Sequence, residues 1–274
     1  MEAATRLALV PDETAPETTA PDATAPHGAV DRLVGADRVL AVLVELARRP
    51  EGATLDDLAR AVASPKSTVH RALTALTRAK LASRPATGQY ALGDEFLRLA
   101  FAYHDARPEH VRIQPVLRAL AERYGETAHY AVLDGDEVVY RAKVDPPSGA
   151  IRLTSTIGGR NPARSTAVGK LLLALALPDD GAARDWARAH PQPPRTPRTV
   201  VDDDAFVVDL ARTRARGYAV DDEENELGIV CLAVPVSLGA VTGAVSVSAL
   251  AYRTPLARLV ADVPTIQLLV AGGA

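Results

Sequence analysis

Apolar residues recur at helical spacing in three short stretches near the beginning of the chain, and turn-forming residues separate these stretches. The first covers residues 36–49, where Val39, Leu43 and Leu46 form one apolar stripe before Pro50. A stripe of this kind predicts an amphipathic helix with one face in a core, and a proline ends it. Residues 36–49 are therefore expected to form one wall of a small helical domain.

The second and third stretches have the form of a helix-turn-helix. Thr54 can cap the second helix, and Asp57 completes an acidic version of the capping box three residues later. Ser64 is expected to cap the third helix, with Pro65 as its first residue, where a missing N–H is tolerated. Apolar residues at helical spacing mark the buried side of each helix: Leu55, Leu58, Ala59 and Val62 in one, and Val69, Leu73 and Leu76 in the other.

The outer side of the third helix carries polar and basic residues near its beginning. Such groups contact phosphates and base edges when a recognition helix enters the major groove of DNA. The candidate DNA-binding residues are Lys66, Ser67, Thr68, His70 and Arg71. Taken alone, this pattern is equally typical of a solvated helix face.

Residues 81–92 predict a β-hairpin directly after the helix-turn-helix, with a turn around Pro85 to Gly88. Three helices followed by a hairpin form a winged helix-turn-helix, a more specific arrangement than two capped helices. We expect this domain to cover residues 34–95. Residues 1–33 combine Pro, Thr, Ala and Asp with few large apolar residues, so we expect a disordered tail there.

Two further helices are expected between residues 93 and 124, interrupted at Pro108, with residues 96–110 as a linker between domains. A helical connector of this kind commonly also dimerises, and a helix-turn-helix protein generally needs two copies to read a two-fold DNA site. Buried positions are expected at Leu97, Phe101, Val111, Val116, Leu117 and Leu120.

From Thr127 onward the hydrophobic period changes towards two. Strands are expected at residues 127–133, 137–144, 150–157, 218–221, 229–235 and 241–250. Helices are expected at residues 163–177, before Pro191, at residues 202–216 and, broken near Pro264, at residues 255–274. Antiparallel strands with helices inserted between them predict an α+β sensor-type domain over residues 111–274. The fold class of the chain is therefore α+β.

Composition and charge fit two ordinary globular domains, one of them with a basic surface. The 274 residues are 47% hydrophobic and 24% charged, and domains commonly hold roughly 100 to 150 residues. The formal net charge is −3, but residues 36–92 hold nine Lys or Arg against five Asp or Glu. That local excess could neutralise phosphates. With no apolar run long enough for a bilayer and an acidic, Pro-rich N-terminus unlike a signal peptide, we expect a cytoplasmic protein.

Four separated blocks of sequence together resemble one family. They are SPKSTVHRALTALTRAKLASR followed by GQYALGDEFLRLA, then GGRNPARSTAVGKLLLA, GYAVDDEENELGIVCLAVPV and GAVSVSA. In this order they look like the isocitrate lyase regulator (IclR) family of bacterial transcription factors. The resemblance implies a winged helix-turn-helix, a helical linker and a GAF-like domain that binds a small, often carboxylated or aromatic, effector. It also implies a dimer or a dimer of dimers that represses or activates catabolic genes by binding double-stranded operator DNA.

By position, the resemblance implies an effector site formed by the backbone at Ala167 and Val168 together with Asp221, Cys231, Ser246 and Ser248. A carboxylate would fit there, because N–H groups at a loop-to-helix junction donate to anions and hydroxyls at i and i+2 of a strand share one face. Cys231 could equally be a small core residue. Arg164 stands where the family usually has histidine, and it could either pair with a carboxylate or face solvent.

The sequence lacks the enzyme motifs that would indicate catalysis. Gly169 and Lys170 lack the remaining residues of a phosphate-binding loop, no G-x-S-x-G motif occurs, and the six histidines include no pair at zinc-ligand spacing. The single cysteine excludes an intramolecular disulfide and a zinc site of several thiolates. We therefore expect no catalytic residue, no cofactor and no metal. Two alternatives stay open: a small-molecule enzyme with a DNA-binding domain, and a protein-interaction module whose second domain has a filled core.

Overall fold

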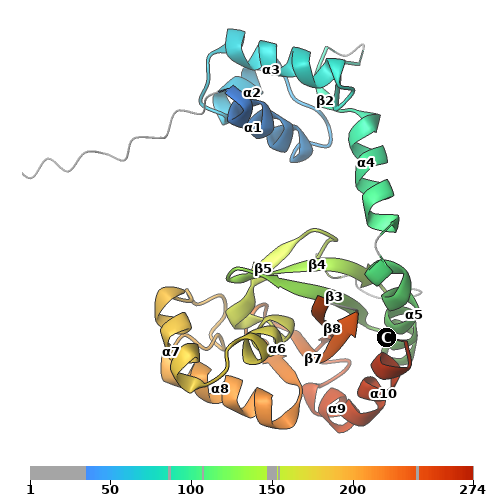
Figure 1. Ribbon diagram of the computed structural model, residues 1–274, viewed down its shortest axis with the longest axis vertical. Coiled ribbons are helices and arrows are strands. Elements are labelled where there is room, and N and C mark those ends of the chain that lie inside the picture. The colour runs from blue at the N-terminus through green and yellow to red at the C-terminus, as the bar shows by residue number, and fades with distance from the viewer. Residues whose placement is uncertain are drawn as a thin grey trace, which may run out of the picture. The chain divides into compact units, whose positions relative to one another are not determined.

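The structure is a computed structural model that describes residues 35–85, 88–106, 108–146, 153, 155–238 and 241–273 (Figure 1). The chain divides into two compact units, Met1–Leu97 and Arg98–Ala274. The predicted disordered tail lies outside the described residues. No helix in the described ranges has both the length and the apolar character that crossing a membrane requires.

The first unit is built on three helices that share one apolar core. They are α1 (Gly35–Ala47), α2 (Leu55–Ala61) and α3 (Lys66–Arg78). The predicted capping box is present, because the backbone N–H of Asp57 donates to Thr54 Oγ1 and that of Thr54 donates to Asp57 Oδ2, both over 3.2 Å. The core holds most of the apolar positions expected from the helical spacing, among them Leu46, Leu58, Val69, Leu73 and Leu76. In α1, Val39 and Leu43 are only partly buried, and Val42, which was not predicted, is fully buried.

The prediction for the start of α3 is wrong by one residue. Pro65 occupies the N-cap position, and Ser64 makes no cap hydrogen bond to α3. Instead, the Ser64 N–H donates to Ala59 O over 3.0 Å and its Oγ donates to Val62 O over 3.1 Å. Ser64 therefore closes the end of α2, since the positive φ of +46° at Ala63 turns the chain back towards that helix.

A short hairpin follows α3. Its strands β1 (Ala82–Ser83) and β2 (Ala91–Leu92) are antiparallel. A single bridge between Ala53 and Tyr90 joins the hairpin to the residue before the Thr54 cap. The predicted turn is described only in part, because residues 86–87 lie outside the described ranges.

The second unit is a six-stranded antiparallel sheet in the order β5-β4-β3-β8-β7-β6. The strands are β3 (Thr127–Asp134), β4 (Glu137–Val144), β5 (Arg160–Pro162), β6 (Ala219–Asp222), β7 (Ile229–Leu238) and β8 (Val241–Leu250). Because side chains alternate along a strand, the sheet contributes to two cores, one on each face. The predicted α+β class is confirmed.

Helices cover both faces of this sheet (Figure 1). One face packs against α5 (Pro108–Tyr124), α9 (Leu256–Ala261) and α10 (Val263–Gly273). On the other face α6 (Ala167–Ala176) packs on the strands, and α7 (Asp180–Ala189) and α8 (Asp203–Arg216) complete the core on that side, with a 3₁₀ turn, η1 (Ala163–Ser165), leading into α6. The break predicted near Pro264 falls at Asp262, between α9 and α10.

The strand expected at residues 150–157 is not found where the structure describes it. Residues 147–152 and 154 lie outside the described ranges, and residues 155–157 are not in a strand. The edge strand is β5 instead, where Arg160 pairs with Val139 of β4. The loop before it is fixed by two hydrogen bonds to Tyr140, from Gly158 N–H to Tyr140 O and from Tyr140 N–H to Gly159 O.

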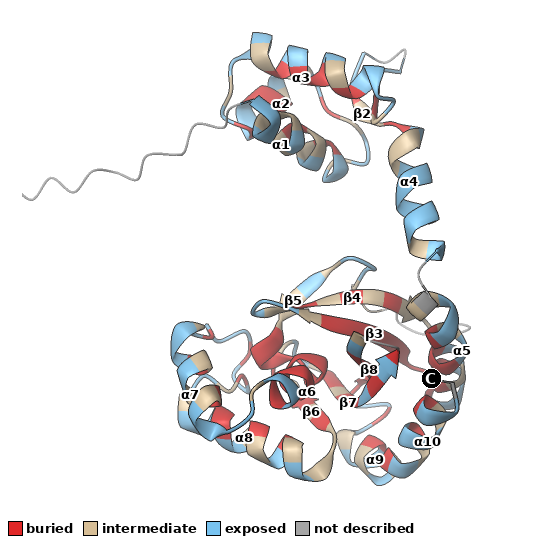
Figure 2. Ribbon diagram, viewed as in Figure 1, coloured by how far each residue is buried: buried red, intermediate tan, exposed pale blue. Residues whose placement is uncertain are grey.

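Three of the expected buried positions around the linker are exposed. Leu97 and Phe101 on helix α4 (Asp94–Asp105) are 49% and 63% exposed, and Val111 on α5 is 64% exposed. Val116, Leu117 and Leu120 are buried against the sheet as expected. Figure 2 shows the same contrast, with α4 largely in the exposed colour. The apolar side of α4 is therefore a surface of this chain.

Candidate ligand-binding cavity and nucleic-acid interface

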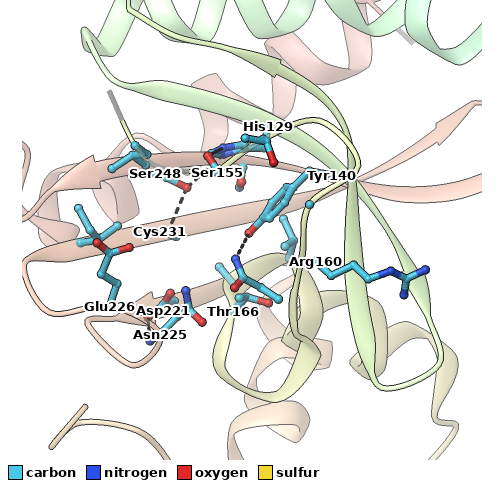
Figure 3. A pocket seen from close by; sticks show the side chains of 18 of the residues that line it. His129, Tyr140, Ser155, Arg160, Thr166, Asp221, Asn225, Glu226, Cys231 and Ser248 are labelled. Carbon is cyan, nitrogen blue, oxygen red and sulfur yellow. Dashed lines mark hydrogen bonds between the residues drawn. The ribbon is translucent and has the colours of Figure 1, made fainter. Parts of the chain in front are cut away.

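A cavity of about 220 Å³ lies on the face of the sheet that packs against α6 (Figure 3). The strand register explains why polar side chains meet there. Asp221 on β6 lies opposite Cys231 on β7, Cys231 lies opposite Ser248 on β8, and Ser246 lies opposite His129 on β3. Residues opposite one another point to the same face, so these strands contribute one polar stripe.

All six residues of the predicted effector site line this cavity: Ala167, Val168, Asp221, Cys231, Ser246 and Ser248. The lining also contains polar residues that the sequence prediction missed: His129, Tyr140, Ser155, Asn161, Thr166 and Asn225. A signal for one of them was available, because His129 interrupts an otherwise apolar strand sequence, AHYAVL. The others come from loops, from the short strand β5 and from β4, and strand alternation alone did not predict which face of the sheet the β4 side chains take.

Hydrogen bonds link four of the lining side chains in a row. The Cys231 thiol donates to Ser248 Oγ over 3.2 Å, and Ser248 Oγ lies 3.4 Å from His129 Nδ1. His129 Nε2 lies 2.8 Å from Ser155 Oγ. Burial lowers the pKa of His129 to about 3, helped by the charge of Lys143, so the ring is neutral at pH 7. A neutral imidazole has one donor and one acceptor nitrogen, and its tautomer decides which serine oxygen accepts the ring N–H and which serine hydroxyl donates to the ring.

Cys231 is not a reactive thiol in this setting. Burial raises the pKa of the Cys231 thiol well above its usual value, and the Asp221 carboxyl group raises it further. The thiolate is the nucleophilic form of cysteine, so a protonated thiol is a poor nucleophile. The Cys231 side chain therefore contributes a weak donor and a small apolar surface to the cavity wall.

Asp221 is the buried acid of the cavity, with 2% of its surface exposed. Its Oδ1 accepts hydrogen bonds from the backbone N–H groups of Glu224 at 2.7 Å and Asn225 at 3.4 Å. Burial raises the pKa of Asp221 to about 7, although the nearby Lys170 ammonium opposes the shift. Both protonation states are thus populated near neutral pH, so Asp221 can either accept or donate a hydrogen bond.

Lys170 holds the loop whose Glu224 and Asn225 N–H groups donate hydrogen bonds to Asp221. Its Nζ donates to Asp209 Oδ2 over 2.7 Å and to Glu224 Oε1 over 2.6 Å, and the residue is 1% exposed. Burial alone would lower the pKa of Lys170, but the carboxylates of Glu224 and Asp209 raise it. Lys170 therefore stays charged and holds Glu224 directly beside the Asp221 carboxyl group.

The N-terminus of α6 forms another part of the cavity wall. Thr166 caps the helix, because its Oγ1 accepts the Gly169 N–H over 3.2 Å and donates to Pro162 O over 3.1 Å. The N–H groups of Ala167 and Val168 belong to the first turn, where a helix has no internal acceptor for them. Together with the helix dipole they can attract an anion.

Arg164 takes neither of the two positions expected for it. It is 2% exposed, yet it does not line the cavity. The η1 turn directs its side chain towards α7 and α8, where the guanidinium donates to Ala187 O over 3.2 Å and to Asp203 Oδ1 over 2.7 Å. It also stacks on Phe206, with its Cζ 4.8 Å from the ring centroid. Arg164 is therefore a buried structural residue that connects the η1 turn to α7 and α8.

Two other arginines line the cavity. The Arg195 Nε donates to Asn225 O over 3.1 Å. Arg160 pairs with Asp134 and Glu137 at the sheet edge, and Figure 3 shows its side chain pointing away from the cavity. Arg195 is thus the cation better placed to meet a negatively charged group at the cavity rim.

The predicted DNA-contacting residues form the outer side of α3. Lys66, Ser67, His70 and Arg71 are exposed, whereas Thr68 is half-buried. Lys66 Nζ lies 2.8 Å from Asp56 Oδ2 of α2, an exposed ion pair that contributes little to stability. The side chains of Val69, Leu73 and Leu76 anchor the opposite side of the helix in the core. The exposed side of α3 is therefore polar and basic while its position is fixed by packing.

Comparisons with known proteins place both units in one family. The family model described as bacterial transcriptional regulator IclR C-terminal matches residues 108–266, and the IclR helix-turn-helix domain matches residues 35–85. The DNA-binding transcriptional repressor YiaJ of Escherichia coli (strain K12) is 34% identical over 215 residues, which cover 77% of this chain and 76% of that protein.

Two solved structures share the fold at useful levels of identity. A putative transcriptional regulator, RHA06195 from Rhodococcus sp. RHA1, has a TM-score of 0.72 at 30% identity, covering 85% of this chain and 95% of that chain. An IclR homolog complexed with 4-hydroxybenzoate, from Microbacterium hydrocarbonoxydans, has a TM-score of 0.69 at 25% identity, covering 85% of this chain and 99% of that chain.

Proposed function

The chain belongs to the IclR family of bacterial transcriptional regulators, and from this membership we propose that a small organic effector in the cavity modulates its binding to operator DNA. Residues 34–95 would form the DNA-reading domain, residues 96–110 the linker and residues 111–274 the effector domain, in the cytoplasm. The observation that carries the effector part of the proposal is the polar cavity beside the first turn of α6.

The lining suggests the chemistry of the effector. A carboxylate would meet the N–H groups of Ala167 and Val168, with Arg195 at the rim. A hydroxyl or a small polar ring would meet the neutral His129 and the serines bonded to it. Such a ligand is a small, carboxylated and hydroxylated or aromatic molecule, and 4-hydroxybenzoate, which the Microbacterium homolog binds, has both groups.

We propose a homodimer or a dimer of dimers as the active form. The exposed apolar side chains of Leu97 and Phe101, four residues apart on one side of α4, support this proposal, since exposed apolar patches commonly mark interfaces between proteins. Two recognition helices would then read two half-sites whose spacing the dimer sets. An effector that favours one dimer arrangement would change operator affinity through a coupling free energy.

The DNA-binding part is tested by replacing a charge on α3. Arg71→Ala should weaken operator binding about tenfold and lower the slope of log affinity against log salt by about 1, because one phosphate contact is lost. Arg78→Ala is the matched control, since Arg78 is exposed in the last turn of the same helix. Gel-shift titrations at several salt concentrations measure both quantities. If Arg71→Ala binds as tightly as the unchanged protein, the interface assigned to α3 is wrong.

The effector part is tested by a thermal-shift screen of small organic acids, beginning with 4-hydroxybenzoate. A ligand that binds the folded chain raises its midpoint temperature. Calorimetry on the best compound should then show saturable binding to the unchanged protein and at least tenfold weaker binding to Ser246→Ala. Equal affinity for the two proteins would show that the compound does not bind in this cavity.

A further inference from the structure

The junction between α4 and α5 brings together two histidines and an aspartate. One ligand atom from each of His104, Asp105 and His110 can be chosen so that all lie within 4.8 Å of one another. The rings of His104 and His110 are in contact, with centroids 3.8 Å apart and planes tilted by 57°. Residues six apart do not share a face of one continuous helix. The end of α4 at Asp105 and the new start of α5 therefore make this contact possible.

Two ring nitrogens at this junction are buried without a hydrogen-bond partner. They are His104 Nε2 and His110 Nδ1, neither of which meets a donor or acceptor anywhere in the described part of the chain. Buried polar atoms in folded proteins nearly always have a partner, so an unpaired one calls for a physical explanation. An imidazole nitrogen that carries a lone pair and has no protein partner is available to coordinate a metal ion.

Asp105 completes the arrangement from the other side of the His104 ring. Its Oδ1 lies 3.3 Å from His104 Nδ1. A carboxylate that accepts the Nδ1–H of a histidine leaves the lone pair on Nε2 and orients the ring, which is the usual supporting contact of metal-binding histidines. The tautomer that this contact favours is the one in which His104 Nε2, the unpaired atom, can bind a cation.

We propose that His104 Nε2 and His110 Nδ1 bind a divalent transition-metal ion of the zinc type, with Asp105 as the orienting partner and water in the remaining positions. Imidazole ligands favour zinc, copper and nickel over magnesium and calcium, which prefer oxygen. The two rings must open slightly from their present contact to admit an ion at about 2.0–2.1 Å from each nitrogen. A bound ion would tie the last turn of α4 to the first turn of α5.

The test uses the full chain without an affinity tag, after chelator treatment and buffer exchange. Isothermal titration with Zn²⁺ near pH 7.5 should show one saturable site per chain. The double variant His104→Gln/His110→Gln should lose this site, and Asp105→Asn should weaken it about tenfold or more, as loss of an orienting partner does. His190→Gln is the matched control, because it removes a histidine whose Nδ1 already has a partner in Trp186 O.

A second measurement separates metal binding from unfolding. Circular dichroism of each variant in chelator should match that of the unchanged protein, since all three substituted side chains lie near helix ends. Co²⁺ should give visible d–d absorption of a nitrogen-bound ion with the unchanged protein and with His190→Gln, but not with the double variant. Absence of a saturable Zn²⁺ site in the unchanged protein, or equal binding by the folded double variant, would overturn the proposal.

Discussion

Buried ionisable side chains give the cavity its character at the scale of single residues. Lys170 is held between two carboxylates, His129 is neutral, and Asp221 has a pKa of about 7. The net charge of the cavity lining therefore changes by one unit near neutral pH, as the Asp221 carboxyl group gains or loses its proton. A carboxylate ligand would meet less repulsion when Asp221 is protonated.

The raised pKa of Asp221 makes stability depend on pH. In the unfolded chain an aspartate has a pKa of about 4. Between about pH 4 and pH 7 the folded chain keeps a proton that the unfolded chain has lost, so this residue's contribution to stability falls as the pH rises through that range. Asp221→Asn removes the effect while its side-chain oxygen can still accept from the N–H groups of Glu224 and Asn225.

We therefore expect Asp221→Asn to gain stability relative to the unchanged protein by about 2 kcal/mol between pH 5 and pH 8. Urea denaturation at the two pH values measures the difference, and the other titrating groups cancel because both proteins contain them. A difference in unfolding free energy that is the same at both pH values would contradict the raised pKa.

The residues of the cavity were predictable where strand alternation or family position fixed them. Cys231, Ser246 and Ser248 belong to two long strands, β7 and β8, whose register leaves little freedom, and Asp221 on the short strand β6 pairs with Cys231. Arg164 was not predictable, because the short η1 turn decides which side of α6 its side chain takes. A single-residue shift in such a turn reverses the direction of a side chain, and the sequence holds no strong signal for it.

At the scale of elements, the position of α6 depends on a close approach to η1. A Cβ atom added at Gly169 would lie 2.1 Å from Ala163 O and 2.3 Å from Ala163 Cα, both backbone atoms. The first turn of α6 can therefore reach the cavity wall only because residue 169 has no side chain.

Gly169→Ala should displace the N-terminus of α6 and destabilise the protein by about 1–3 kcal/mol, the usual cost of overpacking. It should also weaken effector binding more than the loss of stability explains, because the Ala167 and Val168 N–H groups move. Gly272→Ala in α10 is the control, since a Cβ there meets nothing within 4 Å. Thermal unfolding and calorimetry measure the two effects, and equal behaviour of the two variants would show that the contact with η1 is unimportant.

Most helices and strands were predictable because their signals are local. The Thr54 capping box is found in the structure, and the helix expected at residues 202–216 is α8, with Asp202 as its cap and Gly217 at its end. β5 was missed because three residues, Arg160–Pro162, are too few to show alternation. Helix α4 was read correctly as a helix but its apolar residues were expected to be buried, since the sequence cannot say whether a partner surface lies in the same chain.

At the scale of the whole molecule, the apolar side of α4 bears on the proposed oligomer. Phe101→Asp should increase the fraction of monomer and weaken operator binding, because a charge would have to be buried in the interface. Phe101→Leu keeps the position apolar and should behave like the unchanged protein. Light scattering after size-exclusion chromatography measures the mass. A Phe101→Asp variant with unchanged mass at low micromolar concentration would exclude this surface from the interface.

The proposed regulation requires that the cavity and the recognition helix be energetically coupled. Fluorescence anisotropy of labelled operator DNA, selected from genomic fragments, measures this directly in the presence and absence of the compound found by thermal shift. We expect saturating compound to change the operator Kd by a factor of about 5 to 150, the usual range of allosteric coupling. Ser248→Ala should bind operator normally without compound but respond more weakly to it. An operator Kd that is identical with and without saturating compound would show that the cavity and the recognition helix are not coupled.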